Sequence, residues 1–142
     1  MEQLISLDIP ARGEFVVLCR LALAGLLRDR GFSDDAVADL KLAITEACTN
    51  SIRHAYRDEQ GGVGQVHVSY EVTDDRVVLV VQDRGVGFEG DGEPQPARAD
   101  DDPLPTEGGM GISIIRAVVD EFQIERPPSG GTRLILTKLC DS

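Results

Sequence analysis

The chain has 142 residues, of which 42% are apolar and 27% charged, and this composition is typical of one ordinary globular domain. Its formal net charge of −11 argues against nucleic-acid binding, because affinity for phosphate backbones comes from clustered basic residues. The longest apolar helical stretch, residues 15–27, contains Arg20 and is too short to span a bilayer, and nothing at the N-terminus resembles a signal peptide. We therefore expect a cytoplasmic protein that binds neither nucleic acid nor membrane.

Three cysteines lie far apart in the sequence, at Cys19, Cys48 and Cys140. They are odd in number and form none of the close pairs that zinc sites use. We expect reduced thiols, with Cys19 and Cys48 packing as small apolar residues.

The first predicted elements are a strand and a helix. Residues 4–9 (LISLDI) indicate a short strand. From Ala11 to Arg30 apolar residues recur at helical spacing and predict a helix. The recurring positions are Phe15, Leu18, Leu21, Ala22 and Leu26. Gly31 predicts the end of this helix, because glycine readily takes the left-handed conformation of a C-terminal cap.

A second helix is predicted from Ser33, which offers an N-cap, to about Tyr56. Asp34 and Asp35 in its first turn favour the positive end of the helix dipole. One stripe of this helix should pack on the sheet, and it consists of Val37, Leu40, Ile44, Ala47, Ser51 and Ala55.

Glu46 and Asn50 lie one turn apart on a different face of the second helix, with Arg53 close by and His54 at its margin. A solvated polar face is the ordinary explanation of such a pair. Asparagine, however, is a poor residue for a helix interior, because its amide competes with the backbone. Four residues after a carboxylate, it could share a metal ion or a water with that carboxylate. Both interpretations stay open at this point.

A hairpin is predicted in the middle of the chain. Residues 66–72 alternate between apolar and polar side chains and indicate a half-buried strand. The turn at residues 74–75 leads into residues 77–82, whose continuous apolar run predicts a fully buried strand.

Asp83 stands at the end of this buried strand, followed closely by Gly85 and Gly87. A carboxylate is costly to bury unless hydrogen-bond donors surround it, and the exocyclic amine of a ligand is one candidate donor. The two glycines would let the flat ring of such a ligand lie against the backbone. An Asx-type turn with two loop glycines is the alternative.

Residues 89–107 contain four prolines, many acidic residues and almost no large apolar side chain. Such a segment cannot contribute to a packed core, and we predict a mobile loop. A helix from about Gly109 to Val119 follows, and then two strands near residues 121–126 and 132–139, joined by the turn PPSGG. Strands joined by short turns, with helices between other strands, predict an α+β fold. We expect a two-layer sandwich in which helices cover one face of a mixed sheet, with residues 1–142 forming a single domain.

The stretch TEGGMGI, residues 106–112, precedes the last predicted helix. Its glycines Gly108, Gly109 and Gly111 leave backbone N–H groups free at a helix N-terminus, where the dipole favours anions. A flexible hinge is the alternative, and neither a P-loop nor the glycine pattern of a dinucleotide fold is present. Taken together, an amine-reading acid, a metal-holding amide and a phosphate cradle describe an adenine nucleotide with Mg²⁺.

Three segments resemble the ATP-binding boxes of the GHKL ATPases, a superfamily that includes gyrase B subunits and sensor histidine kinases. They are EACTNSIRHAY (46–56), DRGVGF (83–88) and GGMGI (108–112). The form of the first box and the single-domain length are most similar to the anti-sigma-factor serine kinases. The resemblance covers the whole chain, with its weight on residues 40–139.

The resemblance implies a role for each matching residue. Asn50 would coordinate Mg²⁺ that bridges the phosphates, and Glu46 would act as general base on the attacking hydroxyl. Asp83 would accept the adenine amino group, with Thr132 near the base and residues 89–107 as a mobile ATP lid. The glycines would be Gly85 and Gly87 against the base, and Gly108, Gly109 and Gly111 around the phosphates.

The resemblance also implies an activity, namely an ATP-dependent serine/threonine protein kinase that acts as an anti-sigma factor. It would phosphorylate a small anti-sigma factor antagonist on serine and sequester a sigma factor. Such kinases are usually dimers, with partners meeting the first helix. Arg20 on that helix is a candidate contact, although an ordinary solvated arginine is an equal explanation.

Two other functions compete with this one. A non-catalytic ATP-binding regulatory module of the same fold is the first, and Glu46 argues against it because a pure binder needs no base. A fragment of a histidine kinase is the second. It is disfavoured because the chain has only two histidines, His54 and His67, and no helix carries a phosphorylatable histidine outside the first box.

Overall fold

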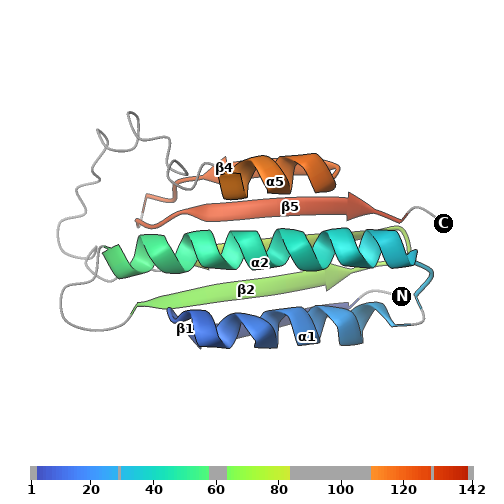
Figure 1. Ribbon diagram of the computed structural model, residues 1–142, viewed down its shortest axis with the longest axis horizontal. Coiled ribbons are helices and arrows are strands. Elements are labelled where there is room, and N and C mark those ends of the chain that lie inside the picture. The colour runs from blue at the N-terminus through green and yellow to red at the C-terminus, as the bar shows by residue number, and fades with distance from the viewer. Residues whose placement is uncertain (1–2, 29, 58–63, 84–109, 129, 141–142) are drawn as a thin grey trace.

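The computed structural model describes residues 3–28, 30–57, 64–83, 110–128 and 130–140, and within them helices cover one face of a sheet (Figure 1). The strands are β1 (Gln3–Pro10), β2 (Gln65–Val72), β3 (Arg76–Asp83), β4 (Glu121–Glu125) and β5 (Arg133–Leu139). The helices are α1 (Val16–Leu27), preceded by a 3-10 turn at Gly13–Phe15, α2 (Asp34–Arg57) and α5 (Met110–Val118). The predicted α+β two-layer sandwich is confirmed.

The sheet has the order β1-β2-β3-β5-β4, and each of its four strand pairs is antiparallel. The expected hairpin of β2 and β3 is confirmed, but the expected mixed sheet is wrong. β3 and β4 do run in the same direction, because each is antiparallel to β5. They are not neighbours, however, because β5 lies between them and pairs antiparallel with both.

β3 differs from the fully buried strand that its apolar run predicts. Val77, Leu79 and Val81 are buried beneath the helices, whereas Val78 and Val80 are half-buried on the opposite face. The helices lie on one face only (Figure 1), so alternate residues of even the central strand remain accessible to solvent. β2 shows the alternation that was predicted for it.

α1 is shorter than predicted and buries a different stripe. It ends at Leu27, and Gly31, with a φ of 87°, lies in the connection to α2 rather than at the cap of α1. The buried side chains are Val16, Cys19, Leu23 and Leu27. Of the predicted positions, Leu18 and Leu21 are 46% and 62% exposed, whereas Phe15, Ala22 and Leu26 pack at the edge of the core. The helix is apolar on more than one face, and helical spacing alone could not decide which face meets the sheet.

α2 begins and packs as predicted. The Ser33 hydroxyl accepts a hydrogen bond of 3.0 Å from the backbone N–H of Ala36, which is the expected N-cap. From the predicted stripe, the side chains buried against the sheet are those of Leu40, Ile44, Ala47 and Ser51, with Val37 partly buried. The side chain of Ala55 lies outside the described residues. Among the parts of the chain that the structure describes, no helix is both long and apolar enough to cross a membrane.

A small polar cluster is enclosed in the core between α1, α2 and β2. Cys19 and Cys48 are free thiols with no exposed surface, as expected of small apolar residues. The Tyr70 hydroxyl, equally buried, donates a hydrogen bond of 2.9 Å to the Cys19 carbonyl. A hydrogen bond to the Cys19 thiol, together with burial, raises the pKa of Cys48 well above its ordinary value. Burial likewise raises the pKa of Tyr70.

Replacing Tyr70 by Phe should therefore have a pH-dependent effect on stability. At neutral pH the variant should lose about 0.5–1.5 kcal/mol of unfolding free energy, because the hydrogen bond to Cys19 is removed. The pKa of Tyr70 is higher in the folded than in the unfolded state, so its contribution is complete below the unfolded value of about 10 and declines as the pH rises above it. Urea unfolding at neutral and alkaline pH should show the gap between the two proteins narrowing. A gap that stays constant with pH would contradict this.

Candidate nucleotide-binding site

The predicted site residues that the structure describes lie towards one end of the sandwich, on the left of Figure 1. α2 runs towards this end, so that its C-terminal half lies there, and β3 finishes there at Asp83. α5 and β5 both start from the same end, at Met110 and Arg133. Segments that are distant in the sequence thus place an acid, an amide and a helix N-terminus in one region.

Asp83 is the last residue of β3 and is only 1% exposed. Its backbone N–H donates a hydrogen bond of 3.1 Å to the carbonyl of Thr132, which is 4% exposed and immediately precedes β5. The pairing of β3 with β5 therefore brings together the two residues that were expected near an adenine base. A carboxylate is buried only where hydrogen-bond donors meet it, so a buried acid at a strand end is a candidate for contact with a donor group of a ligand.

Gly131 shapes the surroundings of Asp83, and the sequence analysis missed it. A Cβ on Gly131 would lie 2.3 Å from the Asp83 carbonyl oxygen and 2.9 Å from its Oδ1, closer than Cβ atoms approach other atoms in proteins. Its φ of 81° also disfavours every residue with a side chain. The available signal was the glycine pair before Thr132, which the sequence analysis assigned only to a turn. The bare backbone leaves the Asp83 carboxylate space that a side chain would occupy.

Glu46 and Asn50 lie one turn apart on α2, and both side chains are half-buried. The Glu46 Oε1 atom lies 3.0 Å from the position that a Cβ would take on Gly111, in the first turn of α5. The structure thus brings the predicted base against the predicted phosphate-binding segment. The first N–H groups of a helix have no partner within the helix and favour anions, including phosphate.

Next to Asn50, the Ser51 hydroxyl is buried and has no hydrogen-bond partner among the described residues. A buried polar atom of this kind indicates a water or a ligand in its vicinity. No group of three His, Cys, Asp or Glu side chains that could hold a metal ion occurs within the described ranges. Magnesium is usually held by few protein oxygens together with substrate phosphates, and the amide of half-buried Asn50, one turn after Glu46 on α2, offers one oxygen of this kind.

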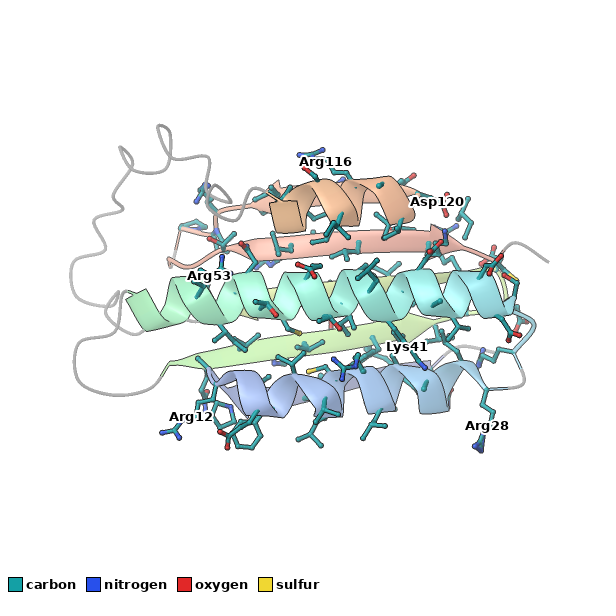
Figure 2. All side chains as sticks on the ribbon, in the orientation of Figure 1. Arg12, Arg28, Lys41, Arg53, Arg116 and Asp120 are labelled. Carbon is teal, nitrogen blue, oxygen red and sulfur yellow. The ribbon has the colours of Figure 1, made fainter. Side chains whose placement is uncertain are left out.

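Several predicted residues cannot be placed. Gly85, Gly87, Gly108, Gly109 and the lid at 89–107 lie outside the described residues, as does the side chain of His54. Arg53 is exposed on the site half of α2 (Figure 2). Arg20, the candidate partner contact, is half-buried and donates a hydrogen bond of 3.4 Å to the Thr45 hydroxyl, so it links α1 to α2 beside Glu46.

Sequence comparisons match this chain to known proteins. Residues 9–138 match the family model described as the histidine kinase-like ATPase domain. The chain is 34% identical to the serine-protein kinase RsbW of Bacillus pumilus, over 97% of this chain and 86% of that protein. It is 32% identical to the serine-protein kinase RsbW of Bacillus subtilis, over 94% of this chain and 84% of that protein.

One solved structure has a similar fold. It contains the RsbU and RsbW domains of a Mycobacterium tuberculosis protein, and it superposes with a TM-score of 0.68 at 23% identity. The similarity covers 99% of this chain but only 33% of the solved chain. At this identity the likeness supports the fold alone.

Proposed function

Since the chain belongs to the histidine kinase-like ATPase domain family and, within it, to the RsbW serine-protein kinases, we propose that it phosphorylates an anti-sigma factor antagonist on serine, with ATP as the phosphoryl donor. In the same proposal the kinase sequesters a sigma factor, and phosphorylation of the antagonist decides which of the two partners it holds. The observation that carries the proposal is the position of Glu46, whose carboxylate lies against the first turn of α5.

Different residues at this end of the sandwich bind different parts of ATP and its magnesium ion. Asp83 accepts a hydrogen bond from the exocyclic amine of adenine, and Thr132 lies beside it through the 3.1 Å backbone hydrogen bond. Asn50 holds Mg²⁺ through its amide oxygen, and the ion offsets the charge of the phosphates. Gly111, together with Gly108 and Gly109, offers backbone N–H groups at the start of α5.

Glu46 performs the proton transfer in this proposal. Its carboxylate accepts the proton of the serine hydroxyl as that oxygen bonds to the γ-phosphorus of bound ATP, while the bond from this phosphorus to the β–γ bridging oxygen breaks and ADP leaves. A carboxylate placed beside a phosphate site is unfavourable for binding alone, because the two negative charges repel. Its presence next to α5 therefore supports a kinase over a non-catalytic ATP-binding module.

The surface of α1 supports the proposed docking of protein partners. Val17, Leu18 and Leu21 are 41%, 46% and 62% exposed and form an apolar patch on this helix. Arg12 and Arg28 lie near its two ends (Figure 2), in a chain whose net charge is −11. Exposed apolar side chains in a cluster are typical of protein-binding surfaces.

We also propose four properties that the resemblance to this family implies. The kinase acts as a homodimer in the cytoplasm, residues 1–142 form one domain, and residues 89–107 are the mobile lid over ATP.

The direct test of the kinase activity is transfer of phosphate from ATP to a purified antagonist, which is first identified by affinity capture from the native cell and mass spectrometry. Phosphoserine on the antagonist in the presence of the kinase, and none with Glu46→Gln, is the expected result. ATP binding without phosphotransfer to any captured partner would favour the non-catalytic module.

Replacing Asn50 by Ala should weaken ATP binding only when magnesium is present. Even residues that merely support a metal ligand typically contribute about 10- to 100-fold to metal affinity, so loss of a ligand should cost at least this much. Calorimetric titration with ATP, in magnesium and in chelator, measures the difference. Thr49→Ala, an exposed neighbour on α2, is the matched control and should bind as the wild type does. An equal loss in both conditions would contradict a magnesium ligand.

A further inference from the structure

Residue 111 is a glycine, although its backbone conformation does not require one. It is the second residue of α5, and it is not among the described glycines with positive φ, which are Gly31, Gly130 and Gly131. Glycine inside a helix costs about 0.5–1 kcal/mol relative to alanine. The local backbone conformation therefore does not explain why residue 111 is a glycine.

The surroundings of Gly111 supply that reason. A Cβ at this position would lie 3.0 Å from Glu46 Oε1, whereas favourable contacts between non-bonded atoms are about 3.5–4.0 Å. An alanine would therefore displace the carboxylate by a few tenths of an ångström. α1 offers the contrast, because a Cβ on its glycine, Gly25, would meet nothing within 4 Å. Of these two helical glycines, only Gly111 therefore has a side-chain atom close to the position of its missing Cβ.

Electrostatics favours the same contact. The first turn of α5 carries N–H groups without partners inside the helix, and the positive end of the helix dipole attracts a carboxylate. Glu46 reaches this turn from α2, which packs beside α5. The bare backbone at Gly111 allows the carboxylate to approach the turn closely.

We infer that Gly111 is a positioning residue for Glu46: the missing side chain sets where the carboxylate rests, and hence where it meets the serine hydroxyl. This inference rests on the proposed kinase function and adds a second role to Gly111, distinct from offering its N–H group to phosphate. In the positioning role, Glu46 leaves no space for a Cβ at residue 111. In the phosphate-binding role, the backbone N–H of residue 111 contacts ATP. The two roles make different predictions for Gly111→Ala.

Gly111→Ala should lower kcat for phosphotransfer by up to about tenfold, because misplacing a catalytic group by about 1 Å can cost roughly 100-fold and the displacement here is a few tenths of an ångström. ATP affinity, by calorimetry, should fall by a smaller factor than kcat does, because the backbone N–H of residue 111 is kept. Urea unfolding should show no more than a small loss of stability, since alanine favours the helix while its Cβ crowds Glu46. In a Glu46→Gln background, the same substitution should cause no further loss of kcat. A loss of equal size in both backgrounds, or a fall in ATP affinity with kcat unchanged, would overturn the inference.

A second measurement does not depend on kinase activity. The ¹³C signal of the Glu46 carboxyl group, followed by NMR without nucleotide, should move in Gly111→Ala and stay in place in Gly25→Ala. If the wild-type protein neither binds ATP nor transfers phosphate, the proposed function fails, and this measurement still tests the contact. A carboxyl signal that is unmoved in Gly111→Ala would overturn the role of Gly111 even in a fully active kinase.

Discussion

Replacing Glu46 by Gln should lower the rate of phosphotransfer by about 10²- to 10⁴-fold, the range typical of losing a general base. Glutamine keeps the size of the side chain and one hydrogen-bonding oxygen, and it removes only the ability to accept the proton. ATP affinity should survive, because a negative charge beside the phosphates does not favour binding and glutamine keeps the shape of the side chain. Steady-state phosphotransfer to the antagonist and calorimetric titration with ATP measure the two quantities separately.

Glu121→Gln provides the matched control, since Glu121 is exposed on the edge strand β4, and it should leave both quantities unchanged. Loss of ATP binding together with activity in Glu46→Gln would show that the carboxylate holds the nucleotide or the fold. The assignment of Glu46 as the base would then be abandoned.

Replacing Asp83 by Asn should lower ATP affinity by roughly 10- to 150-fold, equivalent to about 1.5–3 kcal/mol for a hydrogen bond to a buried charged group. Asp83 is 1% exposed at the end of β3, so a ligand amine that reaches its carboxylate is removed from water. Asparagine has nearly the same shape, but it presents an amide NH₂ group, which only donates hydrogen bonds, in place of one of the two carboxylate oxygens. The substitution therefore tests the negative charge and the two acceptor oxygens of Asp83, while the packing of the side chain stays nearly the same.

The sharper measurement compares ATP with purine riboside triphosphate, which lacks the exocyclic amine. The variant should bind this analogue with an affinity close to that of the wild type, because Asp83 makes no hydrogen bond to it. Asp35→Asn, in the exposed first turn of α2 at the far end of the molecule, is the control for removing an acid. Equal weakening towards both nucleotides would show that Asp83 does not recognise the amine.

The sequence by itself determined the features that depend on neighbouring residues. The alternation in residues 66–72 and the turn at 74–75 are sufficient for the β2–β3 hairpin, and Ser33 caps α2 through its own following turn. The buried stripe of α2 was predictable because its opposite face is strongly polar. The three motif segments also predict a nucleotide site: the first offers a carboxylate and an amide, the second an acid followed by glycines, and the third a run of glycines.

Only the tertiary structure decided which segments meet. Periodicity shows that α1 is apolar, but packing on the sheet selects the Cys19 and Leu23 face and leaves Leu18 and Leu21 exposed. The insertion of β5 between β3 and β4 makes each strand pair antiparallel, and no local pattern encodes that order.

The same insertion brings Gly131 against Asp83, and the packing of α5 beside α2 brings Gly111 against Glu46. These contacts join residues far apart in the chain. Their distances depend on how whole elements pack, whereas the pattern within any one segment shows only which residues are available for contact.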